Sequence, residues 1–305
     1  MKSTRKAYGE TLVKIGEKDE DVVVLDADLS KATCTNLFKE KFPKRHINIG
    51  IAEQDLVGTS CGLALAGKKV FASSFAMFLA GRAYEQVRNS VAYNNANVKL
   101  CATHAGLAVG EDGATHQCLE DIALMTAIPN MIVLQPSDEV QTEKIITNLL
   151  KIETPSYVRL GRSDTEKIYD NNDNFEIGNS YTHGDGKDGT IFSSGITVSM
   201  ALKAKEELKK QNIDVRVVDV YSLKPIDKEN IIKCAKETHK LISIEDHNII
   251  GGLGSLISNV LTDEYPKKLI KIGVKDSFGK SGKATDVLNK YGISVEKIIE
   301  EFNKE

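Results

Sequence analysis

Two histidines enclose a glycine-rich loop, and this segment is the part of the chain best suited to chemistry. It reads CATHAGLAVGEDGATHQ, with His104 and His116 near its ends and Glu111 and Asp112 between them. Imidazole rings and carboxylates in such a loop can bind substrate oxygens and transfer protons. The loop follows an apolar run, 98–103, and open α/β sheets bind ligands at the carboxyl ends of their strands. The sequence therefore predicts a ligand site here.

The same side chains leave a second interpretation open, because two histidines and two carboxylates can also bind a cation. Their spacing lacks the i, i+4 pattern that places two ligands on one helix face, which disfavours this alternative. A metal-dependent hydrolase is the weaker hypothesis, and metal analysis of the purified protein would test it.

An acidic residue and two aromatic residues precede this loop. Glu53 opens an apolar segment of helical period, where a carboxylate stabilises a helix by about 0.3–1 kcal/mol without any further function. Its apolar flanks also indicate burial, and a buried carboxyl group suits proton exchange with a ring nitrogen. Phe75 and Phe78 would lie on one face if this segment is helical and could then hold a flat heterocycle, although core packing also explains them.

The composition is that of an ordinary globular protein with room for two domains. The 305 residues are 41% hydrophobic and 27% charged, and the net charge of −3 gives no electrostatic reason to expect nucleic acid or a membrane surface as partner. The five cysteines form no C-x-x-C pair, which favours reduced thiols. The N-terminus lacks the apolar core of a signal peptide, so we expect a cytoplasmic protein.

Apolar runs alternate with helical segments along both halves of the chain, which predicts parallel sheets covered by helices. The predicted strands are 22–25, 69–73, 98–103, 131–134, 156–160, 189–192, 215–220, 240–244 and 269–272. The predicted helices are 4–15, 53–66, 81–93, 119–127, 139–150, 199–210, 228–238, 253–261 and 283–291. The fold class is thus α/β, with two open α/β domains at 1–163 and 188–305. A polar, Asn/Asp/Gly-rich linker, 164–187, separates them.

The motifs resemble those of the transketolase family. THAGLAVGEDGATHQ is similar to the family signature, in which T-H is followed by G-x-x-V-G-E-D-G-x-T-H-Q, and IAEQD is similar to its catalytic-glutamate segment. SSFAMF matches the F-x-x-F pair of the family, although the third aromatic often found further on falls at Gly81 here. STRKAYGE, DADLS and YVRLGRS, together with VVDVYSLKPID, SIEDHNIIGGLGS and GVKDSFGKSGKATDVLNKYG, extend the resemblance over nearly the whole chain.

The resemblance implies a thiamine-diphosphate-binding fold that receives the pyrimidine ring of the cofactor, followed by a transketolase C-terminal-like domain. Glu53 would share a proton with a ring nitrogen of the aminopyrimidine and act as a catalytic residue. Phe75 and Phe78 would bind the same ring. Asp28, in the DADLS segment, would lie near the cofactor at a subunit interface.

The resemblance also implies the reaction, which moves a two-carbon ketol unit from a ketose phosphate to an aldose phosphate in carbohydrate metabolism. His104 and His116 would bind substrate oxygens and assist proton transfer. Asp112 would accept a hydrogen bond from a hydroxyl of the donor sugar. Arg5 and Arg162 would hold the sugar phosphate.

A diphosphate motif is not recognised in this chain. The family holds Mg²⁺ and the diphosphate with G-D-G followed by Asn. A G-D-G occurs at 184–186, with Asn212 downstream, but it lies in the polar linker and not after an apolar strand. The resemblance therefore implies that this chain supplies no metal ligand. An N-terminal transketolase subunit would hold Mg²⁺ and the diphosphate in a heterotetramer, in which this chain also pairs with itself.

Three alternatives remain at this stage besides the hydrolase. A split deoxyxylulose-phosphate synthase would use pyruvate, so a comparison of pyruvate with a ketose phosphate as donor separates it. The β subunit of a 2-oxoacid dehydrogenase generally lacks the V-G-E-D-G-x-T-H loop. A non-catalytic assembly or regulatory subunit is disfavoured by the intact Glu53 and His104.

Overall fold

The structure is a computed structural model that describes residues 1–304; Glu305, the end of the predicted domain 188–305, lies outside the described residues. Its first sheet has seven strands in the order β12-β6-β7-β5-β4-β2-β3, and all but β12 run parallel. Their bounds are β2 Val22–Asp26, β3 His46–Asn48, β4 Lys69–Phe75, β5 Val98–Thr103, β6 Ile132–Leu134, β7 Ser156–Arg159 and β12 Ser222–Lys224.

Helices cover both faces of this sheet, because alternate residues of each buried strand point to opposite sides. Val22 and Val24 pack in one core cluster with α1 and α7, whereas Val23 and Leu25 pack in another with α4 and α6. The helices of this unit are α1 Thr4–Lys18, α2 Ser30–Thr33, α3 Asn36–Lys41, α4 Glu53–Leu65, α5 Tyr84–Gln86, α6 Asp121–Thr126 and α7 Glu139–Leu149.

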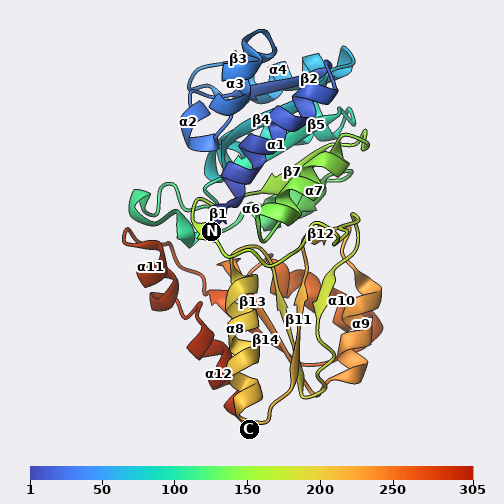
Figure 1. Cartoon of the computed structure of the whole chain (residues 1–305), viewed down its shortest axis with the longest axis vertical. Helices are drawn as coiled ribbons and strands as arrows, with labels where there is room; N and C mark the ends of the chain where they lie inside the picture. Colours follow the sequence, from blue (N-terminus) through green and yellow to red (C-terminus); the bar gives the residue numbers. More distant parts are fainter. Residues whose placement is uncertain (305) are drawn as a thin grey trace.

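The second sheet lies below the first along the long axis of the molecule (Figure 1) and has five strands in the order β14-β13-β10-β11-β9. Only β9 runs antiparallel to its neighbour. The strands are β9 Tyr181–His183, β10 Gly189–Ser193, β11 Val215–Asp219, β13 Lys240–Asn248 and β14 Leu269–Val274. The helices are α8 Thr197–Lys210, α9 Lys228–Glu237, α10 Leu253–Glu264, α11 Ala284–Lys290 and α12 Val295–Asn303. Two parallel α/β sheets covered by helices confirm the predicted fold class.

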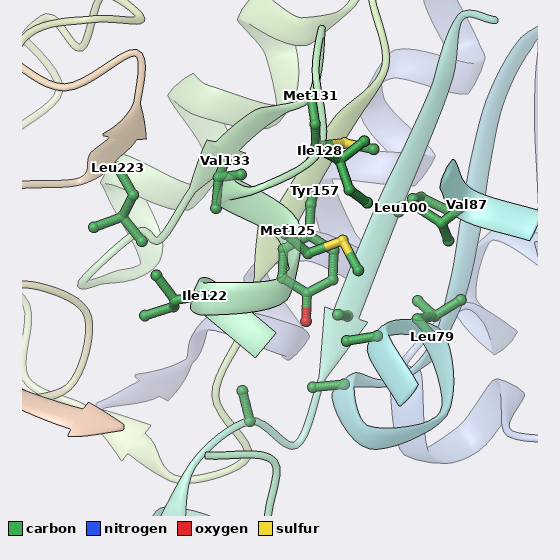
Figure 2. Close-up of a cluster of buried hydrophobic side chains, with 14 of the residues drawn as sticks. Leu79, Val87, Leu100, Ile122, Met125, Ile128, Met131, Val133, Tyr157 and Leu223 are labelled. Atoms are coloured by element: carbon green, nitrogen blue, oxygen red, sulfur yellow. The ribbon is translucent and has the colours of Figure 1, made fainter. Parts of the chain in front are cut away.

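The helix predicted over 81–93 is wrong in detail. In its place the chain forms two π-helical segments, Met77–Arg82 and Val87–Ala92, separated by the short α5. Figure 2 shows Leu79 and Val87 from these segments directed toward Leu100 of β5, all within one buried cluster. This apolar contact fixes the segment that carries Phe78 against the sheet.

The predicted linker, 164–187, contains regular structure. β8 (Asp164–Thr165) pairs antiparallel with β1 (Lys2–Ser3) at the N-terminus, and β9 joins the edge of the second sheet. β12 also connects the two units. It follows β11 of the second sheet in sequence but pairs with β6 of the first sheet. Leu223 of β12 lies in the same cluster as Ile122 and Val133 in Figure 2, so the two units share a core. Within residues 1–304 no helix has the length and apolar character needed to span a bilayer.

Candidate functional site

The predicted site residues follow the carboxyl ends of adjacent strands in the first sheet. The chain reaches Asp28 after β2, Glu53 after β3, His104 after β5 and Arg162 after β7, while Phe75 ends β4. The strand order β7-β5-β4-β2-β3 therefore arranges them along one edge of the sheet. This is the edge where an open parallel sheet binds ligands.

Glu53 is the first residue of α4, and only 1% of its surface is exposed. The Nη1 group of Arg82 donates a hydrogen bond to its Oε2 atom over 2.6 Å. The guanidinium carbon of Arg82 also lies 4.6 Å from the centre of the Phe78 ring, over its face. A buried carboxylate needs such a partner. The Arg82 side chain is about half-exposed, so it can move away from Glu53 into solvent.

Four rings form a cluster beside this ion pair. Phe75 stacks on Phe78 with a centroid distance of 5.8 Å and on His104 with 3.9 Å. His116 stands edge-on to Phe78 at 5.5 Å. The structure thus brings together both aromatic residues and both histidines named from the sequence, and Arg82 links them to Glu53.

His104 is held as a neutral ring. Burial lowers its pKa to about 3, and the positive charges of Arg5, Arg162 and His116 act in the same direction. Its backbone has a φ of +57°, which is uncommon for a residue other than glycine and occurs often at functional sites. The Nδ1 atom lies 2.9 Å from Thr103 Oγ1, which fixes the ring plane against Phe75.

Arg5 and Arg162 come from opposite ends of the first unit, and the small β1–β8 pair brings them together. The Thr4 side chain accepts a hydrogen bond of 2.8 Å from the Gly161 amide, which strengthens this connection. Both arginines line one open cavity of about 370 Å³. Arg5 Nη1 donates to the Ala32 carbonyl, and its buried Nε has no partner among the described residues.

Neither of the two remaining predicted residues, Asp112 and Asp28, is among the residues that line this cavity. Asp112 lies on the exposed loop, with Oδ1 3.7 Å from Arg162 Nη1. Asp28 is exposed, and its amide donates a hydrogen bond to the Asn48 side chain over 3.0 Å. No group of three His, Cys, Asp or Glu side chains suited to a metal ion occurs within residues 1–304.

The glycine-rich loop is held from the second unit, which the sequence did not indicate. Asp246, at the carboxyl end of β13, accepts hydrogen bonds from the amides of Leu107 at 2.7 Å and Ala108 at 3.1 Å. A side chain at Gly106, whose φ is +79°, would overlap this carboxylate. Asp246 and Arg82 are the site residues that sequence reasoning missed, because neither contact is between neighbours in sequence.

Comparison with known proteins gives consistent matches over both units. Family models described as "Transketolase, pyrimidine binding domain" and "Transketolase, C-terminal domain" match residues 1–167 and 178–298. The whole chain is 50% identical to 98% of a candidate transketolase C-terminal section from Methanocaldococcus jannaschii. Over 98% of its length it is 38% identical to 96% of one subunit of the apulose-4-phosphate transketolase from Phocaeicola vulgatus.

A solved structure described as a split-gene transketolase in an inactive β4 tetramer has the same fold. It superposes with a TM-score of 0.93 and 45% sequence identity, covering 99% of this chain and 97% of that one. The match therefore includes the relative placement of both sheets and of the loops at their edges.

Proposed function

The chain belongs to the transketolase family, and from this premise we propose that it is one of two kinds of subunit that together form a thiamine-diphosphate-dependent transketolase. The assembled enzyme transfers a two-carbon ketol unit from a ketose phosphate to an aldose phosphate. The observation that carries the proposal is the buried Glu53 carboxylate beside the stacked Phe75 and Phe78 rings.

These residues fit the pyrimidine end of the cofactor. Phe78 offers a ring face that Arg82 now covers at 4.6 Å, and a flat heterocycle could stack there instead. Glu53 lies next to that face, and its carboxyl group, once protonated, could share its proton with an uncharged ring nitrogen. Thiamine diphosphate, when bound, supplies the electron sink that accepts the two-carbon unit.

The side chains around the ring site have distinct tasks in this proposal. Glu53 holds a proton at a pyrimidine nitrogen, and Arg82, whose one hydrogen bond to Glu53 goes to Oε2, moves off the Phe78 face that the ring occupies. His104, kept neutral by its burial, offers a hydrogen bond to a substrate oxygen without introducing a charge. His116, which stands edge-on to Phe78, binds a second oxygen.

The substrate's charged end faces the cavity lined by the two arginines. Arg5 and Arg162 bind the sugar phosphate, for which a planar guanidinium is suited because it can donate two parallel hydrogen bonds. Asp112 lies close enough to Arg162 to hold a sugar hydroxyl beside that phosphate. Asp28 is exposed and acts, in this proposal, at the contact with another subunit.

The diphosphate and Mg²⁺ belong to a partner subunit in this proposal. The described residues offer no ligand set for a divalent cation. The G-D-G at 184–186 follows the antiparallel edge strand β9, at the amino ends of the parallel strands and therefore away from the site. Relatives described as a C-terminal section, a transketolase subunit and a split-gene protein support a separate chain for this half.

A Glu53→Gln variant tests the assignment. The amide cannot hold the proton as a carboxyl group does, so turnover of xylulose 5-phosphate with ribose 5-phosphate should fall by about 100-fold or more in the reconstituted two-subunit enzyme. Glu85→Gln, an exposed change in the neighbouring helix, is the matched control. Near-normal turnover of Glu53→Gln would contradict the role of Glu53, and turnover of pyruvate in place of the ketose phosphate would identify a synthase.

A further inference from the structure

The cavity that contains Arg5 and Arg162 has a third cationic residue, and it comes from the second unit. Lys283, which directly precedes α11, lines the same 370 Å³ space from the side opposite the first sheet. The rest of the lining is the loop from Ala108 to Glu111, together with Ser163, Asp164 and Ala284. Residues from four separate segments of the chain therefore line one space.

The backbone around Lys283 is fixed against the glycine-rich loop. Ser281 Oγ donates a hydrogen bond of 2.6 Å to the Glu111 carbonyl, and Gln117 Nε2 donates one of 3.0 Å to the Lys280 carbonyl. A Cβ atom at Gly110 would lie only 3.2 Å from the Gly282 carbonyl oxygen, so glycine permits this close approach. The segment 280–284 thus has a defined position, while the Lys283 side chain is exposed to the cavity.

Only part of the positive charge in the cavity is paired with carboxylates. No carboxylate of residues 1–304 lies within 4.0 Å of the Lys283 amine, whereas the surface lysines at 297 and 304 are paired. Arg162 meets the exposed Glu111 and Asp112 only at 3.7 Å. Arg5 uses one nitrogen on the Ala32 carbonyl and has a buried Nε without a partner among the described residues.

We propose that Lys283 is a specificity-determining residue that binds the phosphate of the sugar substrate together with Arg5 and Arg162, so that the C-terminal domain takes part directly in substrate recognition. The inference rests on the proposed function and deepens it. A lysine ammonium is a compact charge on a flexible stem, and it can follow a phosphate that two planar guanidinium groups hold from the other side. A doubly charged phosphate gains most from this third cation, and an uncharged sugar gains nothing.

The test compares a phosphorylated with an unphosphorylated acceptor. In the reconstituted enzyme, Lys283→Ala should raise KM for ribose 5-phosphate by about tenfold, the loss expected for one charge-assisted hydrogen bond, and leave kcat nearly unchanged. Lys283→Glu should raise the KM for ribose 5-phosphate further. With glycolaldehyde as acceptor, kcat/KM should stay within about twofold of the parent enzyme. Lys290→Ala, at the far end of α11, is the control.

A binding measurement on the purified chain separates this inference from the proposed function. Millimolar inorganic phosphate should raise the Tm of the parent chain and of Lys290→Ala, and the shift should be smaller in Lys283→Ala. Equal KM values for ribose 5-phosphate in parent and Lys283→Ala, or equal losses with both acceptors, would overturn the role of Lys283 and leave the transketolase assignment intact. A parent enzyme that turns over neither acceptor would remove the proposed function, and the sugar-phosphate role of Lys283 with it.

Discussion

At the residue scale, the pairing of Glu53 with Arg82 shows how the chain keeps a buried carboxylate without the ring it is proposed to bind. Removing a carboxylate from water is costly unless a charge or hydrogen bond replaces the water. Arg82 provides both, at 2.6 Å, and its other face rests on Phe78. Because about half of the Arg82 side chain stays in solvent, releasing it costs less than breaking a fully buried pair.

His104 gives a prediction about pH. Its folded-state pKa of about 3 lies below the ordinary value of 6.5, so between these values the unfolded chain binds a proton that the folded chain excludes. The stability that depends on this ring is therefore complete above pH 6.5 and is lost as the pH falls toward 3. The expected loss at pH 5 is about 2 kcal/mol.

Urea unfolding of the parent chain and of His104→Gln at pH 7.5 and pH 5 measures this loss. Because glutamine does not titrate, the free energy of unfolding should fall by about 2 kcal/mol less in the variant than in the parent. His239→Gln, at an exposed position, is the control. The same fall in parent and His104→Gln would show that the ring becomes protonated without difficulty and is not held neutral.

At the element scale, the carboxyl end of β13 positions the glycine-rich loop. Asp246→Ala would leave the amides of Leu107 and Ala108 buried without an acceptor, at a cost of about 2–4 kcal/mol in the free energy of unfolding. Amide hydrogen exchange at 106–113 should become faster than in the rest of the first unit. Asp263→Ala, an exposed change in α10, should alter neither quantity.

These measurements distinguish a role of Asp246 in positioning the glycine-rich loop from a role in stability alone. If Asp246 holds the loop, the exchange rates at 106–113 rise even under conditions in which the chain stays folded, and KM for the sugar phosphate rises more than kcat falls. A lower stability with unchanged exchange at 106–113 would mean that Asp246 serves the contact between the two units and does not position the loop.

The predicted elements that the structure confirms are those with a strong local pattern. β2, β5, β10 and β11 are buried at every residue, and such runs read as strands of a parallel sheet. The four rings were named from separate short motifs, each a few consecutive residues, which is the information that a single sequence carries. Their clustering was not predicted; it comes from the pairing of β4 with β5, since Phe75 ends β4 and His104 follows β5.

The features that sequence reasoning missed depend on distant parts of the chain. β8 and β12 are very short, and only their partners β1 and β6 make them strands. The π-helical segments depend on how Leu79 and Val87 pack against β5. The hydrogen bonds of Asp246 to the loop span more than a hundred positions. No local pattern distinguishes such an aspartate from an ordinary loop residue.

At the scale of the whole molecule, both units contribute to one cavity, and the edge of the first sheet carries the ring site. The first unit provides Glu53, the aromatic pair and the two arginines, and the second provides Asp246 and Lys283. In the proposed assembly, one cofactor spans two chains and crosses this edge. The proposed partner therefore has to cover the surface next to Glu53 and not the far end of α4.

Ile51 tests that placement. It lies two residues before Glu53, which begins α4, and 77% of its surface is exposed. Leu65, the last residue of α4, is 63% exposed. α4 has 13 residues, so the two positions are separated by a helix of about 20 Å.

Ile51→Asp should prevent activity from being restored with the partner subunit, because a charge would be buried in the contact, while the Tm of the isolated chain stays within about 2 °C of the parent. Leu65→Asp should reconstitute normally. Sedimentation of each variant mixed with the partner, followed by assay of the complex, measures both effects. If Ile51→Asp assembles and works as the parent does while Leu65→Asp fails, the partner covers the opposite end of α4, and the cofactor cannot reach it from Glu53.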